Sequence, residues 1–417
     1  MSKRVEPEIE TFARIRVVGV GGSGKNAINH MINSKVRGVE FIAVNTDAQD
    51  LHRSLSKRKI HIGKNLTRGL GAGMNPELGK RAAEETRQEI QEALSGSDMV
   101  FITCGMGGGT GSGASAIVAK IAKEIGALVI AVVTKPFSFE GAQRKEIAER
   151  GLAELKKEVD AFIVIPNDKL LSIVDTKTSA KSAFAMCDEI LRQAVEGVSD
   201  IITTAGDINT DFNDIKAIME GAGPALMGIG IAEGDERARE AAQQAVNSPL
   251  LDVSISGAKG ILFVVAGSDD LGIMEVQEAA KVVNESVDKN AKVIFGIMRD
   301  EKLKKGQLRI IVIATGFPES AAHASHAGPE RSLFAMPSER REEERGRIYH
   351  EVLKREEKPE EDKSKGKRVA EETPPAAAVK EEPIVTAMPH KREEVAPAPE
   401  DDEAWGAIPA FLRRHKK

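Results

Sequence analysis

Cysteine, histidine and large aromatic residues are scarce in this chain of 417 residues. It has one tryptophan, one tyrosine, eight histidines and two cysteines, Cys104 and Cys187. Cysteines so far apart match neither the spacing of a zinc site nor that of a redox pair, so both are expected to be reduced, packed thiols. The histidines form no paired-ligand pattern. No metal site built from protein side chains is therefore predicted.

Long apolar runs and a positive net charge are also missing. No segment reaches the roughly 20 apolar residues that cross a bilayer, and the first twelve residues are too polar for a signal peptide. We therefore expect a cytoplasmic protein that does not insert directly into a membrane. The net charge of −5 argues against nucleic-acid binding driven by bulk charge, so no nucleic-acid partner is expected.

What the chain does contain is alternating apolar and helical patterns from Arg14 onward. Runs rich in Val and Ile predict buried strands at 15–20, 41–45, 99–104, 128–133 and 161–165. Helical patterns lie at 26–33, 76–94, 115–125 and 144–159. This alternation predicts an α/β, Rossmann-like domain with a mostly parallel sheet covered by helices on both faces.

The second half of the chain follows a different plan. The stretch 179–204 has no proline and only one glycine, Gly197, which predicts one long central helix. Helices at 214–219, 236–246 and 274–287, with strands at 227–231, 260–266, 293–298 and 308–315, predict a smaller α+β domain. The predicted organisation is an N-terminal extension (1–13), an α/β domain (14–178), a central helix (179–205), an α+β domain (206–318), a disordered linker (319–400) and a terminal peptide (401–417).

The most informative stretch runs from Gly105 to Gly113, where six of nine residues are glycine. It lies between an apolar run and a helical pattern, so it predicts a strand, a loop and a helix. Backbone N–H groups in such a loop can converge on an anion, and the helix directs its positive end to the same point. A phosphate-binding loop is predicted.

A second glycine loop, at Gly19–Asn26, permits more than one interpretation. Gly19, Gly21 and Gly24 fit a dinucleotide-binding fingerprint, and Asp47 could supply its acidic ribose ligand. A P-loop is nearly matched through Lys25, but Asn26 stands where a Ser or Thr should bind magnesium. A dinucleotide domain has no need of a second glycine cluster, so the two loops together favour a triphosphate held from two sides.

Gly105–Gly113 resembles the tubulin signature, in the form found in the bacterial cell-division members of the tubulin/FtsZ family. Asn45–Gln49, Pro136–Gly141 and Ile165–Leu171 resemble loops that follow other strands in that family. The resemblance runs from about Ile15 to Phe317 and resumes at the C-terminus. It implies a GTPase that polymerises head to tail into the filaments of the division (Z) ring at midcell. Magnesium would be held mainly through phosphates and water.

The resemblance also assigns residues to GTP or GDP. The phosphates would be lined by Gly22, Ser23, Gly24, Asn26, Gly107, Gly108, Gly109, Thr110 and Gly111. The sugar side would be lined by Glu140, Arg144 and Asn167. Phe184 and Asp188 would bind guanine, since their spacing places them on one face of a helix, where a ring can stack and a carboxylate can accept the N1 and N2 protons. From the residues alone, a core Phe184 and a solvated Asp188 are the simpler interpretation.

Hydrolysis is expected to depend on Asn209, Asp211 and Asp214. Their segment resembles the family loop that reaches into the nucleotide pocket of the next subunit, where carboxylates and an amide would polarise the attacking water. No single general base is assigned among them. From the residues alone, Asp211 is simply the N-cap of a helix that begins at Phe212.

The last 17 residues, 401–417, regain apolar character after a long polar stretch. They resemble the family's tail peptide, which docks on membrane-tethering division proteins of the FtsA/ZipA kind; a frayed terminus is the alternative. Ser23, Lys25, Glu189 and Asp207 depart from the usual family pattern. The rival functions are a nicotinamide-dependent oxidoreductase and a filament that binds GTP without hydrolysing it.

Overall fold

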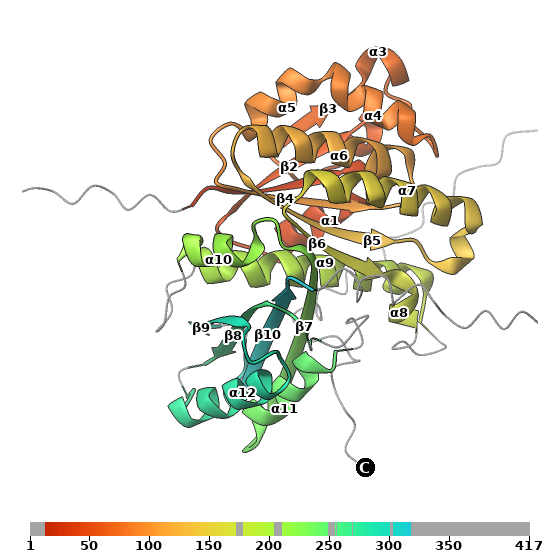
Figure 1. The fold of residues 1–417 in the computed structure, drawn as a ribbon. Coiled ribbons are helices and arrows are strands. Elements are labelled where there is room, and N and C mark those ends of the chain that lie inside the picture. Colours follow the sequence, from red (N-terminus) through yellow and green to blue (C-terminus); the bar gives the residue numbers. More distant parts are fainter. Residues whose placement is uncertain are drawn as a thin grey trace, which may run out of the picture. The chain divides into compact units, whose positions relative to one another are not determined.

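The computed structural model describes residues 13–171, 178–203, 211–248, 255, 257–268, 270–300 and 303–317. The predicted linker and terminal peptide, the N-terminal extension up to residue 12, and Asn209 and Asp207 lie outside these ranges. Within them the chain forms a sheet with the strand order β3-β2-β1-β4-β5-β6-β7-β10-β8-β9 (Figure 1).

The first six strands are parallel and build the N-terminal α/β part. They are β1 (Ile15–Val20), β2 (Val39–Asn45), β3 (Arg58–His61), β4 (Met99–Gly105), β5 (Leu128–Lys135) and β6 (Ala161–Pro166). The helices that follow them are α1 (Gly21–Asn33), α2 (Ala48–His52), α3 (Lys64–Thr67), α4 (Pro76–Glu85), α5 (Arg87–Leu94), α6 (Gly109–Glu124), α7 (Ala142–Glu158) and α8 (Asn167–Leu171). A short 3₁₀ turn, η1, covers Ser138–Glu140. The predicted α/β fold with a parallel sheet is confirmed.

Both faces of this sheet are buried, as parallel strands require. Along β1, Val17 packs into one hydrophobic cluster with α1, while Val18 packs into another with α4, α6 and α7. Phe101 and Ile102 on β4 divide between the same two clusters. Because successive side chains of a strand point to opposite faces, each of these strands contributes to both hydrophobic clusters.

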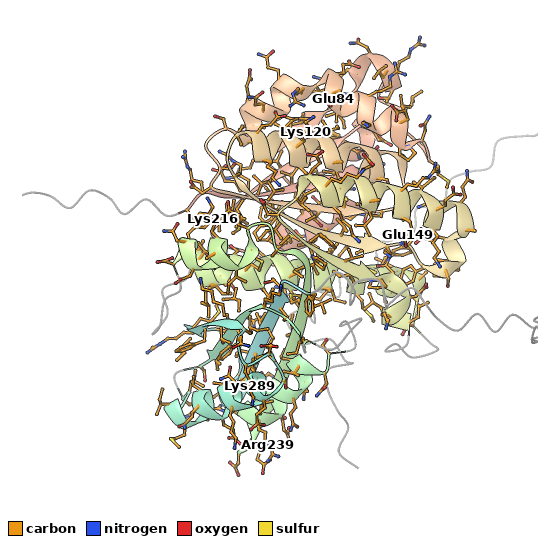
Figure 2. All side chains as sticks on the ribbon, viewed as in Figure 1. Glu84, Lys120, Glu149, Lys216, Arg239 and Lys289 are labelled. Carbon is orange, nitrogen blue, oxygen red and sulfur yellow. The ribbon has the colours of Figure 1, made fainter. Side chains whose placement is uncertain are left out.

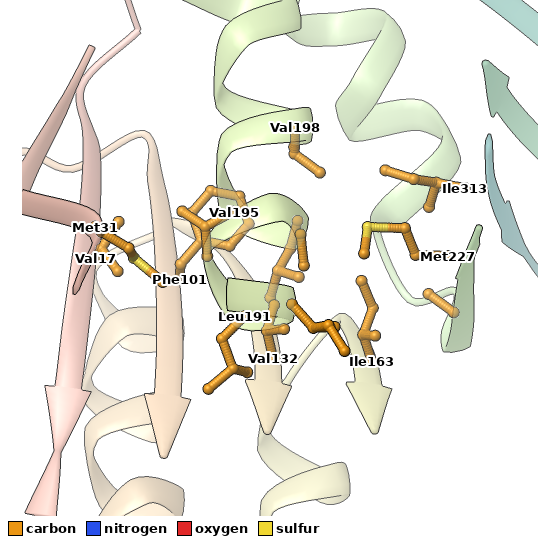
Figure 3. Packing of buried hydrophobic residues seen from close by; sticks show 14 of the residues in the cluster. Val17, Met31, Phe101, Val132, Ile163, Leu191, Val195, Val198, Met227 and Ile313 are labelled. Atoms are coloured by element: carbon orange, nitrogen blue, oxygen red, sulfur yellow. The ribbon is translucent and has the colours of Figure 1, made fainter. Parts of the chain in front are cut away.

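The long helix α9 (Ala180–Thr203) lies between the N-terminal and C-terminal parts of the described structure. Its apolar side contributes Leu191, Val195 and Val198 to the cluster that also contains Phe101 from β4 and Met227 from β7 (Figure 3). At about 1.5 Å per residue a helix of this length spans roughly 36 Å, more than the length of any strand of the parallel sheet. The predicted central helix is confirmed.

The C-terminal part carries the helices α10 (Phe212–Met219), α11 (Arg237–Val246) and α12 (Ile273–Glu285). Its strands are β7 (Gly223–Glu233), β8 (Gly260–Gly267), β9 (Lys292–Arg299) and β10 (Gln307–Thr315). β10 pairs antiparallel with β7 and β8, and β9 is parallel to β8. The helices α11 and α12 pack on one face of these strands over a third hydrophobic cluster. The predicted α+β pattern is confirmed.

Several local features differ from the sequence prediction, among them the short helices α2, α3 and α8, which were not predicted. The predicted helix 76–94 is interrupted at Thr86, whose φ of −106° and ψ of 20° leave the helical region. Strand β3 was not predicted, because only Ile60 of its four residues is fully buried. Helices α1 and α6 begin inside the glycine loops, at Gly21 and Gly109, rather than after them.

Charged side chains line the outer surfaces of the helices (Figure 2). Glu84 on α4, Lys120 on α6 and Arg239 on α11 are exposed, opposite the apolar faces of their helices. No helix in the described part of the chain is both long and apolar enough to span a membrane.

Candidate nucleotide-binding and hydrolysis site

A cavity of about 400 Å³ lies at the edge of the parallel sheet where β1, β4, β5 and β6 end, which we call the carboxyl edge. Ligands in sheets of this type bind at that edge. Of the residues predicted to bind nucleotide, the following line the cavity: Gly22, Ser23, Asn26, Gly108, Gly109, Thr110, Gly111, Glu140, Arg144, Asn167, Phe184 and Asp188. Five separate segments of sequence therefore meet at one place.

The ends of two helices supply the donors of the cavity. Val20 before α1 and Gly108 before α6 make no side-chain cap, so the first N–H groups of both helices have no side-chain acceptor there. The first turn of any helix leaves such donors unsatisfied and carries the positive end of its dipole. Two uncapped helix ends at one cavity form a site for a multiply charged anion.

The glycines of the second loop serve close packing as well as the anion site. A Cβ on Gly109 would lie 2.7 Å from the Gly73 carbonyl oxygen, and one on Gly111 would lie 2.5 Å from that of Gly105. One on Gly113 would overlap the Pro76 carbonyl oxygen. Only glycine lets α6 approach β4 and the start of α4 so closely.

Two predicted phosphate residues do not line the cavity. Gly24 faces β4, where a Cβ would overlap the Thr103 carbonyl oxygen, so this glycine lets α1 pack against the sheet. Gly107 has a φ of +99°, and its N–H donates to Ser112 Oγ at 2.8 Å. Both residues shape the loops from behind rather than facing the cavity.

The cavity wall predicted to face the sugar is formed by η1, α7 and the start of α8. Glu140 accepts a hydrogen bond from the Phe137 backbone N–H at 3.0 Å and pairs with Arg144 at 3.2 Å. Asn167 is 4 % exposed, and its Oδ1 has no hydrogen-bond partner in the described structure. An unsatisfied buried acceptor is costly, so its presence on a cavity wall indicates a ligand donor.

The cavity wall predicted to face the base is formed by α9. Phe184 is 44 % exposed, and its ring meets that of Phe137 edge to face at 5.3 Å. Burial raises the pKa of Asp188 to about 6, although the charges of His30 and Lys25 oppose the shift. An exposed ring and a largely buried carboxyl thus lie one helical turn apart on the cavity wall.

Sequence reasoning missed several lining residues. Gly73 lines the cavity and its carbonyl accepts the Gly109 N–H at 2.7 Å, so the loop 69–73 is a third glycine loop at this site. Its alternating glycines were visible in the sequence. Thr134, Pro136 and Cys187 also line the cavity, and their residue types carried no comparable pattern.

Lys25, Asp47 and Glu189, for which the sequence left alternatives open, each have a defined partner in the structure. Lys25 is 7 % exposed and pairs with Asp50 at 2.6 Å instead of lining the cavity, unlike the lysine of a P-loop. Asp47 caps α2 by accepting the Asp50 N–H at 2.9 Å, so it is not at the cavity as a ribose ligand. Glu189 pairs with His30 and with Arg192.

Asp211 and Asp214 do not line the cavity. Asp211 caps α10 by accepting the Asp214 N–H at 2.8 Å, as the N-cap interpretation expected. The helix α10 leads into β7, whose Gly223 pairs with Ala161, the first residue of β6. That is the edge where the parallel strands begin, which we call the amino edge.

The course of α9 agrees with this placement. Phe184, near its start, lies at the cavity, whereas Ser199 reaches the carbonyl of Arg37, just before β2 begins. Thr203 packs where a Cβ of Gly38 would be. Since α9 ends at the amino edge and Asp211 follows after seven residues outside the described ranges, the two aspartates and the cavity belong to opposite edges of the sheet.

Residues 14–175 match the Tubulin/FtsZ family, GTPase domain, and residues 223–318 match the FtsZ family, C-terminal domain. The chain belongs to the tubulin/FtsZ family. It is 48% identical to FtsZ of M. jannaschii, as seen in an empty FtsZ dimer, with a TM-score of 0.71 over 74% of this chain and 89% of that one. That relative is archaeal, so the match shows membership of the family and does not show a bacterial origin.

Two solved structures of lower identity share the fold. CetZ2 from Haloferax volcanii, in a GTPγS-bound protofilament, is 22% identical, with a TM-score of 0.64 over 75% of this chain and 96% of that one. CetZ1 of the same organism, a GDP-bound monomer, is also 22% identical, with a TM-score of 0.63 over 73% and 94%. Because this chain carries the family's GTPase domain over the glycine loops described above, it is a GTPase rather than a nicotinamide-dependent oxidoreductase.

The residues at the cavity fit a guanine nucleotide. The two uncapped helix ends suit the phosphates, the unpartnered Asn167 Oδ1 can accept a sugar or base donor, and Phe184 and Asp188 suit a purine with two N–H donors. The described residues contain no group of three Asp, Glu, His or Cys side chains arranged for a metal ion.

Proposed function

We propose that this tubulin/FtsZ protein binds GTP in the carboxyl-edge cavity and assembles head to tail, each copy completing the site of its neighbour. Asn209, Asp211 and Asp214 of one copy would polarise the water that attacks the γ-phosphate held by the next. The observation that carries the proposal is the separation of Asp211 and Asp214 from the cavity of their own chain.

Head-to-tail contact follows from this division of the site. A surface patch at one edge that must meet a different patch at the other edge makes a heterologous contact, and such contacts propagate as filaments unless they close into a ring of subunits. The FtsZ dimer and the CetZ2 protofilament among its relatives support self-association of this chain. Filaments of this kind would form the division ring at midcell in bacterial cytokinesis.

Magnesium would be held mainly by the phosphates and water in this proposal. Bound there, it would neutralise charge on the phosphates during transfer. In this proposal, α1 and α6 of this chain orient the nucleotide. The carboxylates of the neighbouring copy orient the water. Residues 401–417 would bind a membrane-tethering protein of the FtsA/ZipA kind.

A mixing experiment tests the shared site. Asp211→Ala keeps an intact cavity but lacks the donated carboxylate, whereas Asp188→Asn keeps the donated loop but weakens guanine binding. Each variant alone should hydrolyse GTP poorly, and Asp211→Ala should still assemble. In an equal mixture roughly a quarter of contacts join a good loop to a good cavity, so about a quarter of wild-type turnover should return.

Two outcomes would count against the proposal. If the mixture is no more active than its components, the loop does not act across a contact. If turnover per molecule stays constant as wild-type protein is diluted below assembly, measured by sedimentation in parallel, hydrolysis does not require assembly. GTP binding without turnover at any concentration would instead favour the scaffold filament.

A further inference from the structure

Lys25 is a buried cation behind the first glycine loop. It belongs to α1, is 7 % exposed, and its Nζ lies 2.6 Å from Asp50 Oδ1 on α2. The other oxygen of Asp50 accepts a hydrogen bond from Asn45 Nδ2 at 2.8 Å. The ammonium group thus meets a carboxylate that is itself fixed by a second partner.

This carboxylate lies directly behind the phosphate-facing turn. A Cβ on Gly22 would be only 3.5 Å from Asp50 Oδ2, and Gly22 itself lines the cavity. A bare negative charge at the N-terminus of α1 would offset the positive end of the helix dipole and repel a phosphate bound there. Asp50 therefore needs a counter-ion if the loop is to hold an anion.

The same pair is connected to the second glycine loop. Asn45 Oδ1 accepts the Thr46 backbone N–H at 2.8 Å, and Thr46 Oγ1 lies 2.6 Å from Thr110 Oγ1 on α6. Thr110 also lines the cavity. One run of contacts thus extends from Lys25 through Asp50 and Asn45 to the start of α6.

We propose that Lys25 is a positioning residue for nucleotide binding, which acts as the internal counter-ion of Asp50 and not as a phosphate ligand. Neutralising Asp50 keeps the turn at Gly22 attractive to phosphate. Holding Asp50 against Asn45 also fixes Thr46 beneath Thr110. This inference rests on the proposed use of the cavity for GTP.

A double variant distinguishes a lysine that acts as the counter-ion of Asp50 from one that contacts phosphate directly. GDP affinity of the purified full chain is measured by titration calorimetry below the concentration of assembly. Lys25→Met should bind about ten-fold more weakly, because an uncompensated charge near the phosphates costs on the order of one logarithmic unit of affinity. Lys25→Met combined with Asp50→Asn should bind within about three-fold of wild type. A lysine that contacted phosphate directly would leave the double variant as weak as the single one.

A matched control is available at the amino edge. Lys123 pairs with Asp160 at 3.5 Å, and neither residue lines the cavity. Lys123→Met should leave GDP affinity unchanged. In turnover assays, Lys25→Met should raise KM and leave kcat near wild type in fully assembled protein, which general destabilisation would not produce.

The results separate this inference from the proposed function. Wild-type protein that binds no GDP would overturn the proposed function. Wild-type binding with an unchanged Lys25→Met, or with a double variant as weak as Lys25→Met, would overturn the counter-ion role alone. If Lys25→Met does not fold, the double variant still decides, since it carries neither charge.

Discussion

His30 Nε2 on α1 lies 2.9 Å from Glu189 Oε2 on α9, so the helix behind the first glycine loop is joined to the helix that carries Phe184 and Asp188. Glu189 also accepts hydrogen bonds from Arg192 at 2.6 and 2.8 Å and from Gln193 at 2.7 Å. Burial alone would raise the pKa of Glu189, but these hydrogen bonds outweigh it and hold the pKa at about 2. Glu189 therefore binds α1 to α9 instead of binding the base.

Replacing Glu189 with alanine should destabilise the fold. Arg192 would lose its principal partner while remaining largely buried, which costs about 2 kcal/mol of unfolding free energy after discounting for partial exposure. Because the folded pKa lies below the usual 4.5, this stabilisation is present above pH 4.5 and is lost as the pH falls towards 2. Urea titrations of wild type and Glu189→Ala should therefore converge in acid. Equal stability at pH 7 would contradict this account.

Asp188 should make guanine binding sensitive to pH. Its pKa of about 6 means that the carboxyl is ionised at pH 7 and largely protonated at pH 5. Only the ionised form can accept both the N1 and N2 protons, so GDP affinity should fall about ten-fold between pH 7 and pH 5. Calorimetric titrations across this range measure the loss. The charges of His30 and Lys25 oppose the rise in the pKa of Asp188.

The control for that pH dependence is Asp188→Asn. This variant should bind GDP weakly at every pH and show no comparable loss between pH 7 and pH 5. An unchanged pH profile in Asp188→Asn would assign the dependence to another group.

Replacing Asn167 should weaken nucleotide binding while changing the free energy of unfolding little. Its buried Oδ1 has no partner in the described structure, so removing it relieves an unsatisfied acceptor while leaving a small gap. Asn167→Ala should change the unfolding free energy by less than about 1 kcal/mol and weaken GDP binding roughly ten-fold. Thermal unfolding without and with GDP measures both effects. A large loss of stability in the absence of GDP would show that Asn167 is structural.

The order of strands and helices could be predicted from this sequence because each element has a clear apolar period. Both faces of β1 and β4 are buried, and the runs around Val17 and Phe101 are mostly apolar. Strand β3 escaped prediction because it is an edge strand in which Arg58 and Lys59 are exposed. Edge strands carry charge to avoid pairing with other chains, and so lose the pattern that reveals them.

The starts of α1 and α6 could not be predicted, since glycine gives no sign of helix. The close approach of Pro76 and Gly105 leaves no room for side chains at Gly113 and Gly111, and that depends on contacts far away in the sequence. The nucleotide residues came from resemblance to a family, and most of them line one cavity. The Lys25–Asp50 pair was not foreseen, because nothing in the sequence shows that a lysine of α1 faces α2.

Two glycines of the second loop should behave in opposite ways. Alanine at Gly113 would overlap the Pro76 carbonyl oxygen and should cost about 3 kcal/mol or prevent folding. Gly108 has a φ of −96° and no atom within 4 Å of an added Cβ. The free energy of unfolding of Gly108→Ala should therefore lie within about 0.5 kcal/mol of that of wild type. Since Gly108 lines the cavity, its methyl group should nevertheless weaken GDP binding. Urea unfolding and calorimetry distinguish the two effects, and equal stabilities would contradict the packing argument.

Removing residues 401–417 should separate tethering from hydrolysis. The cavity and the segment around Asp211 both lie within residues 14–317, so a chain ending at residue 400 should assemble and hydrolyse GTP like the full chain. A short apolar segment within a polar stretch is typical of a motif that orders on its partner, and its loss should abolish that binding. Binding to a purified tethering protein of the FtsA or ZipA kind, measured by fluorescence anisotropy with the isolated 401–417 peptide as competitor, tests this directly. If the shortened chain still binds, or if the peptide fails to compete, the tethering surface lies elsewhere on the protein.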